Sequence, residues 1–388
     1  PTPGSDRAGC RPVGSPELLA RLVVGAGLVS LGLVAPAPVV DSQSIPVPVP
    51  TSDPALERDL DAVLALSPPD TCLTVSIDGT VAFDHRGTDP QVPASTQKLI
   101  TVAAALDALG PDHTYATEAV ASGAVVDGTL AGDLVLVGAG DPVLVTAATA
   151  SEWNLSEDRP RTILDDLADQ LVASGLRRVE GSVLADEGRY DTLRAVPSWP
   201  QRHLRDNLSG PLSAAAVDKG YLVRSDGERT TVVRSPDPAG AAAGALTWLL
   251  ASRGVEVGGA PSSGAAPAGA TTLAAVRSPA LEVIAADLLA RSDNTAAEML
   301  LKELGALAGD GSTAGGARAA AAWLDEGSLA DPGATVVDGS GLDTGNQVSC
   351  HELVETLDSN PALAPLLPVA GRSGTLADPV SYTHLRAH

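Results

Sequence analysis

The stretch that most constrains this chain of 388 residues is PASTQKLITVAAALDALGP, from Pro93 to Pro111. Its apolar residues recur at helical spacing until Gly110-Pro111, which ends a helix. Ser95 is therefore expected on the first turn of a buried helix, and Lys98 follows three residues later on the same face. The sequence thus predicts a helix whose first turn pairs a hydroxyl with an amine.

A serine and a lysine at this spacing have a chemical use. A serine hydroxyl is a poor nucleophile until a base takes its proton, and a lysine can be that base when burial keeps it neutral. The N-terminus of a helix adds partial positive charge where an alkoxide would form. This stretch alone leaves another interpretation open, in which Ser95 caps the helix and Lys98 is solvated.

A second polar motif, Ser292-Asp293-Asn294, lies between two amphipathic segments at 278–291 and 295–307. Thr295 and Glu298 fit the capping-box pattern at the start of the second segment. A polar triplet between two helices is expected to form a tight turn that directs its side chains into a cleft. The alternative for the triplet alone is an ordinary helix cap.

Together these motifs resemble the serine D-Ala-D-Ala carboxypeptidases/endopeptidases of peptidase family S13, the PBP4-like penicillin-binding proteins. The resemblance covers most of residues 52 to 378. It rests on four segments, namely PASTQKL, RSDNTAAEMLLKELG (291–305), VVDGSGLDTGNQVS (336–349) and LVGAGDPVL (136–144).

The resemblance implies an α/β (α+β) fold, with a β-lactamase/transpeptidase-like catalytic domain and a large, mostly β insertion. Roughly two hundred residues separate Ser95 from Ser292, which is more than a simple β-lactamase has there. A strand at 271–276 is expected to rejoin the first sheet, and another is expected at 334–337. The expected divisions are 1–40 signal peptide or anchor, 41–52 Pro-rich linker, 53–110 catalytic domain, 111–270 inserted domain or domains, 271–379 rest of the catalytic domain, and 380–388 foreign tail.

The resemblance also implies roles for individual residues. Ser95 would attack the substrate carbonyl, Lys98 would be the base, and Ser292 and Asn294 would relay the proton and orient the substrate. The turn at 338–342 would border the cleft, with Ser340 and Gly341 as substrate-binding residues. Without the resemblance, Asp-Gly-Ser-Gly is simply good turn chemistry.

The N-terminal region predicts export. Arginines precede an apolar run at 22–34, and Ala35-Pro36-Ala37 follows it, as in a signal peptide or an uncleaved anchor. Membrane contact is expected only through this segment. In an exported domain Cys72 and Cys350 are either a disulfide or two buried thiols, and we expect the disulfide.

Composition excludes some classes of partner. The net charge of −23 argues against nucleic acid, which requires a basic face. Aromatic residues make up only 2%, so small side chains must supply much of the packing. No cofactor is expected, and no metal site, because the two histidines of the last nine residues lack accompanying ligands.

The family's third motif, Lys-Thr-Gly, is missing, since no lysine follows Lys302. Arg372-Ser373-Gly374-Thr375 imitates it, but its glycines are poor strand formers. We therefore expect a C-terminally truncated reading frame, with the true motif beyond His388 and little or no activity in the chain as given.

The sequence thus predicts an exported serine-type D-Ala-D-Ala carboxypeptidase or endopeptidase. It would act on peptidoglycan stem peptides through an acyl-enzyme and would be acylated by β-lactams. The alternatives are a catalytically impaired cell-wall binding protein on the same fold, and a related esterase or β-lactamase.

Overall fold

The structure is a computed structural model that describes residues 54–225, 229–369 and 371–377. The predicted signal or anchor, the linker and the C-terminal tail lie outside these residues. The helices are α1 Pro54–Leu64, α2 Gln97–Leu109, α3 Ala147–Glu152, α4 Leu164–Ala173, α5 Gln201–Arg205, α6 Pro238–Ser252, α7 Leu281–Arg291, α8 Asn294–Leu307, α9 Thr313–Glu326 and α10 Cys350–Ser359. Short 3-10 turns are η1 Ala94–Thr96, η2 Asp218–Gly220, η3 Ala364–Leu366 and η4 Gly374–Leu376.

Most of the strands are short. They are β1 Leu73–Ile77, β2 Thr80–His85, β3 Ala116–Ala121, β4 Val125–Val126, β5 Thr129–Leu130, β6 Leu134–Val137, β7 Leu144–Val145, β8 Thr162–Ile163, β9 Arg178–Val179, β10 Val183–Asp186, β11 Tyr221–Ser225, β12 Thr230–Arg234, β13 Glu256–Val257, β14 Ser262–Ser263 and β15 Thr271–Arg277. Thirteen of these fifteen strands, β3 to β15, lie after α2 and before α7, so the expected β-rich interval is present.

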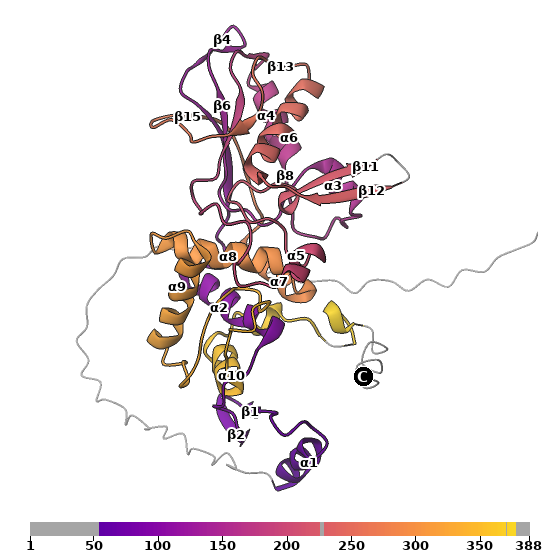
Figure 1. Cartoon of the computed structure of the whole chain (residues 1–388), viewed down its shortest axis with the longest axis vertical. Coiled ribbons are helices and arrows are strands. Elements are labelled where there is room, and N and C mark those ends of the chain that lie inside the picture. The colour runs from indigo at the N-terminus through magenta and orange to yellow at the C-terminus, as the bar shows by residue number, and fades with distance from the viewer. Residues whose placement is uncertain (1–53, 226–228, 370, 378–388) are drawn as a thin grey trace, which may run out of the picture. The chain divides into compact units, whose positions relative to one another are not determined.

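Helix α2 lies within a cluster of helices and contacts α7, α8, α9 and α10 (Figure 1). A helix that is apolar on nearly all sides is stable only when it is surrounded by protein. The middle of α2 is Ala103-Ala104-Ala105, and each of these residues is at most 1% exposed. Small side chains let neighbouring helices approach closely, as the scarcity of aromatic residues predicts.

The contact between α8 and α9 shows the same use of small residues. A Cβ on Gly316 of α9 would lie 1.9 Å from the carbonyl oxygen of Leu301 in α8. Since no real Cβ approaches an oxygen that closely, only glycine allows these two helices to pack at this separation.

A five-stranded sheet, in the order β14-β10-β6-β3-β15, contributes to a hydrophobic cluster separate from the one around α2. Strand β10 pairs in parallel with β14 and β6, and β3 pairs antiparallel with β6 and β15. Helices α4 and α6 contact each other and pack against this sheet (Figure 1). Leu164, Leu167 and Leu171 of α4 are buried against the same cluster as Leu134 and Leu136 of β6.

Two expected strands differ from the structure. Strand β15 pairs with β3 and not with the β1–β2 hairpin of the first sheet. The reason is packing, because Ala274 and Val276 are buried in the hydrophobic cluster of the five-stranded sheet. The segment 334–337 forms no strand, and Thr335 makes only an isolated bridge to Gln347.

The β1–β2 hairpin, turned by Asp78-Gly79 as predicted, precedes the segment that leads to Ser95. A disulfide joins Cys72, next to β1, to Cys350, the first residue of α10, with a Cα–Cα distance of 6.0 Å. Among the residues that the structure describes, no helix is both long and apolar enough to cross a membrane.

Candidate active site

Ser95 lies in η1, immediately before α2, and is exposed to solvent. The preceding residue, Ala94, has a φ of 48°, which is uncommon for a residue with a side chain. Such backbone conformations cost free energy and persist where the surrounding structure fixes them, often at functional sites. The N-terminal end of α2 thus presents an accessible hydroxyl in a fixed turn.

Lys98, one helical turn later, is 1% exposed. Its amine donates to the Ser95 hydroxyl at 3.3 Å, to Asn294 Oδ1 at 2.7 Å and to the Ser340 carbonyl at 2.6 Å. Burial lowers the pKa of Lys98 from 10.5 to about 8, against the opposing effect of nearby carboxylates, of which Glu298 is the strongest. Lys98 is therefore within reach of Ser95 and loses its proton more easily than an ordinary lysine.

Ser292 completes the hydroxyl pair, because its Oγ donates to Ser95 Oγ at 2.9 Å. It occupies the left-handed position that ends α7, with a φ of 56°. Glycine is usual at such a position because it adopts the left-handed conformation without strain. A serine there indicates that its side chain is required in spite of the strain. The residues at positions 95, 98, 292 and 294, predicted from two distant motifs, thus lie together.

The start of α8 differs from the predicted capping box. Asp293 is the N-cap, and its carboxylate accepts the backbone N–H of Ala296 at 3.2 Å and pairs with Lys219. Thr295 already lies inside the helix, where its hydroxyl accepts the backbone N–H of Gly210 at 2.8 Å. Glu298 cannot then complete a capping box, because it lies two residues beyond Ala296, the N3 position that a capping box uses.

The side-chain amide of Asn294 has a fixed orientation. Its Nδ2 donates to the carbonyl of Leu208 at 2.7 Å, which leaves Oδ1 to accept from Lys98. Leu208 belongs to the interval between the two motifs, and the sequence offers no signal for a backbone carbonyl in this role.

The turn at 338–342 packs against η1 and α2. A Cβ on Gly341 would lie 1.6 Å from the carbonyl oxygen of Ala94, so only glycine fits. The Ser340 side chain is fully buried, and the residue meets Lys98 through its carbonyl. Because its side chain is buried, Ser340 supports Lys98 through its carbonyl. The structure thus differs from the substrate contact that we expected for the Ser340 side chain.

Asp338 anchors the same turn and is fully buried. Its carboxylate accepts the Trp199 indole N–H at 2.8 Å, the Asn346 amide at 2.8 Å and two backbone N–H groups. Sequence analysis did not predict a role for Trp199, and its loop carries no periodic pattern that could have indicated one. A buried carboxylate with several donors holds its segment in one conformation.

Comparison with known proteins identifies the family. The family model described as "D-Ala-D-Ala carboxypeptidase 3 (S13) family" matches residues 52–226 and 222–387. The chain belongs to the S13 family. The resemblance predicted from the four sequence segments is therefore confirmed.

Two curated proteins are similar to this S13 chain over most of its length. "Carboxypeptidase Rv3627c" of Mycobacterium tuberculosis is 30% identical over an alignment of 387 residues, which covers 97% of this chain and 77% of the relative. A "D-alanyl-D-alanine carboxypeptidase" of Actinomadura is 30% identical over 412 residues, covering 83% of this chain and 73% of the relative.

The fold of this S13 protein matches a solved structure, penicillin binding protein 4 (dacB) from Haemophilus influenzae. The TM-score is 0.67 at 20% sequence identity, covering 81% of this chain and 82% of that one. The predicted α/β (α+β) fold with a transpeptidase-like catalytic part is confirmed.

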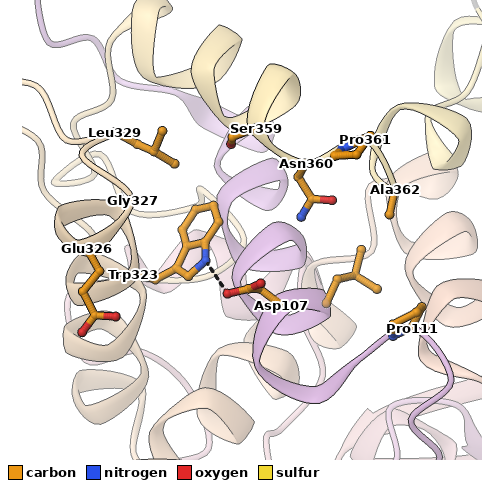
Figure 2. Close-up of a pocket in the computed structure, with 11 residues that line it drawn as sticks. Asp107, Pro111, Trp323, Glu326, Gly327, Leu329, Ser359, Asn360, Pro361 and Ala362 are labelled. Atoms are coloured by element: carbon orange, nitrogen blue, oxygen red, sulfur yellow. Dashed lines mark hydrogen bonds between the residues drawn. The ribbon is translucent and has the colours of Figure 1, made fainter. Parts of the chain in front are cut away.

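A separate hollow in this S13 protein lies toward the other end of α2. Figure 2 shows this cavity of about 530 Å³, in which Trp323 Nε1 donates to Asp107 Oδ2 at 3.2 Å. Asp107 follows Ser95 by twelve residues, or about 18 Å along the helix axis. The lining residues are Leu106, Asp107, Pro111, Trp323, Glu326, Gly327, Leu329, Ser359, Asn360, Pro361 and Ala362. None of the predicted catalytic side chains is among them.

The segment Arg372–Thr375 lies beside the end of α7, where Ser373, Gly374 and Thr375 line a hollow together with Ala290 and Arg291. It leads into the 3-10 turn η4, which contacts α7, and the Ser373 hydroxyl accepts the backbone N–H of Val369 at 2.9 Å. This is turn structure, as its glycines predict. Within the described ranges no group of three or more His, Cys, Asp or Glu residues is placed to hold a metal ion.

Proposed function

We propose that this S13 protein is a serine-type D-Ala-D-Ala carboxypeptidase that remodels peptidoglycan through an acyl-enzyme. The observation that carries the proposal is the position of Ser95 Oγ, within hydrogen-bond distance of both Lys98 Nζ and Ser292 Oγ. A nucleophile, a base of lowered pKa and a second hydroxyl are the groups that acyl transfer requires.

In the proposed reaction, Lys98 in its neutral form takes the proton of Ser95 as the hydroxyl attacks the carbonyl of the penultimate D-Ala. The new Ser95 ester bond forms and the peptide C–N bond breaks. The proton passes from Lys98 through Ser292 to the amine of the departing D-Ala. Water then hydrolyses the ester and restores the Ser95 hydroxyl.

The surroundings of Ser95 support this sequence of steps. The N-terminal end of α2 carries partial positive charge close to the oxyanion that develops in the transition state. Asn294, held by Leu208, keeps the Lys98 amine in place beside the Ser95 hydroxyl. A β-lactam also presents an amide carbonyl, in a strained ring, so we infer that it acylates the same hydroxyl.

The protein is proposed to work outside the cytoplasm, where peptidoglycan stem peptides and β-lactams are accessible. The disulfide between Cys72 and Cys350 supports an oxidising compartment. The mode of export rests on the N-terminal segment, which lies outside the described residues.

The test is covalent labelling of the protein with a fluorescent penicillin. The label is expected on wild-type protein and not on Ser95→Ala. Thr96→Ala is a matched control, because Thr96 is the neighbouring exposed hydroxyl. A label that persists in Ser95→Ala would refute the assignment. Retention by peptidoglycan without any acylation would favour a cell-wall binding protein instead.

A further inference from the structure

Glu298 is a fully buried carboxyl that the proposed reaction does not use. It lies on α8, one turn after Asn294, and faces the turn at 338–342. Its Oε1 accepts the backbone N–H groups of Gly339 at 3.1 Å and Ser340 at 2.8 Å. The structure gives its Oε2 no hydrogen-bond partner. A buried carboxyl in this state is costly, so its presence calls for a functional explanation.

The peptide group between Gly339 and Ser340 is held from several sides. The Thr101 hydroxyl of α2 donates to the Gly339 carbonyl at 2.8 Å. Lys98 donates to the next carbonyl, that of Ser340, at 2.6 Å. The Ser340 N–H and the Gly339 carbonyl belong to one planar trans peptide group, so Glu298 on one side and Thr101 on the other fix that group. The Ser340 carbonyl belongs to the next peptide group, whose Gly341 N–H donates to Asp338 Oδ1.

We propose that Glu298 is a positioning residue for Lys98. By accepting the N–H groups of Gly339 and Ser340, it fixes the backbone of the turn up to Ser340, and Asp338 fixes the following peptide group, so that the Ser340 carbonyl stays in place to accept from the Lys98 amine. The amine, held by this carbonyl and by Asn294, then keeps one orientation toward Ser95. This inference deepens the proposed function and rests on Lys98 being the base.

The charges around the pair are consistent with this role. The carboxylates that act on Lys98 are Glu298, Asp338 and Asp293, in order of decreasing effect. Burial, together with Asp338, raises the pKa of Glu298 from 4.5 to about 8. Hydrogen bonds from the turn oppose this rise in the pKa of Glu298. The N–H groups that Glu298 accepts are therefore a contact separate from the effect of its charge on Lys98.

The experiment compares Glu298→Ala with Glu298→Gln, which retains an oxygen in the position of Oε1. One readout is the rate of acylation by a fluorescent penicillin as a function of pH. The second is the titration of the Lys98 side chain by ¹³Cε NMR in lysine-labelled protein. The chain has only three lysines, so Lys219 and Lys302 are internal references.

Glu298→Ala is expected to slow acylation about tenfold or more and to lower the Lys98 midpoint by about one pH unit, because the amine loses a fixed acceptor. Glu298→Gln is expected to restore most of the rate and part of the midpoint, because the amide oxygen can still accept the N–H groups but the charge of the carboxylate is lost. Glu298→Asp withdraws the carboxyl by one methylene and is expected to behave like Glu298→Ala, so it replaces that variant if the alanine protein does not fold.

Glu303→Gln is the matched control. Glu303 is also fully buried on α8, but its carboxylate pairs with Arg189 and accepts from the Tyr190 hydroxyl instead of from the N–H groups of the 338–342 turn. Its replacement is expected to lower the melting temperature and leave the Lys98 midpoint unchanged.

Three results would overturn the proposal. They are an unchanged or raised Lys98 midpoint in folded Glu298→Ala, equal defects in Glu298→Ala and Glu298→Gln, and an equal shift in Glu303→Gln. The NMR titration does not depend on acylation. A wild-type protein that fails to react with penicillin would therefore reject the proposed function and still allow this test of Glu298.

Discussion

The Asn294 amide oxygen lies 2.7 Å from the Lys98 amine and joins two helices that are far apart in the sequence. The other end of the same amide donates to Leu208. Because that donation fixes which atom of the amide faces the lysine, the base has one defined neighbour on α8.

The first prediction concerns Lys98 as the base. Lys98→Arg retains the positive charge, but a guanidinium does not lose its proton near neutral pH. We expect acylation by penicillin to fall by about 10³-fold or more, since a general base commonly contributes 10² to 10⁴. The second-order rate of labelling measures this effect. Lys219→Arg is the control, and a comparable loss there would indicate a general effect of replacing lysine.

The second prediction concerns pH. Lys98 acts in its neutral form, and burial lowers its pKa to about 8. The acylation rate should therefore rise with pH, by about tenfold per unit well below 8, and level off above this value. Labelling rates between pH 6 and 9.5 check the profile. A rate that is flat below pH 8, or one that falls as the pH rises through 8, would contradict the assignment of the base.

The third prediction concerns Gly341. Its φ is 80°, and a Cβ would lie 1.6 Å from the Ala94 carbonyl oxygen. Gly341→Ala should displace the turn that carries Ser95 and abolish most labelling. Gly79→Ala is the control, because Gly79 has a φ of 74° and nothing within 4 Å of a Cβ. The control should lose only about 1 kcal/mol of unfolding free energy and label normally. Equal labelling by the two variants would show that the contact is not required.

Much of the site could be predicted from sequence because its chemistry lies in short motifs. Ser95 and Lys98 share a helical face by their spacing alone. The role of Glu298 could not be found in the same way, because Thr-x-x-Glu is a good capping pattern and only the tertiary fold places Asp293 at the cap. The pairing of β15 with β3 likewise depends on the hydrophobic cluster in which Ala274 and Val276 are buried. The alternation of apolar and polar residues along the strand does not specify that cluster.

The fourth prediction concerns Trp199, whose indole N–H donates to buried Asp338. Trp199→Phe removes this donor and should cost about 1–3 kcal/mol of unfolding free energy, because the carboxylate loses a partner. Labelling should also slow, since Asp338 anchors the turn behind Lys98. Trp248→Phe is the control, because Trp248 on α6 is 64% exposed. Denaturant unfolding measures the loss of stability, and labelling rates measure the effect on acylation. A fully stable, fully active Trp199→Phe protein would exclude a role for Trp199 in anchoring Asp338.

The fifth prediction concerns the disulfide. Replacing Cys72 and Cys350 together by serine should lower the unfolding free energy by about 2–5 kcal/mol, because the bond closes a very long loop. Ser95, Lys98, Ser292 and Asn294 lie within this loop but are held together by their own hydrogen bonds, so labelling at low temperature should be retained. Thermal unfolding of both forms, with and without reductant, measures the effect. If reductant leaves the melting temperature of the wild-type protein unchanged, the disulfide contributes little to stability.

The partners of Asn294 and Asp338 on the 111–270 segment have a consequence for engineering. A minimised chain that joined residue 110 directly to residue 271 would keep all four polar side chains of the site. It would nevertheless lack the Leu208 carbonyl that aims Asn294 and the Trp199 indole that anchors Asp338. Attempts to shrink this protein to a compact catalyst therefore have to rebuild those two contacts before the nucleophile can work.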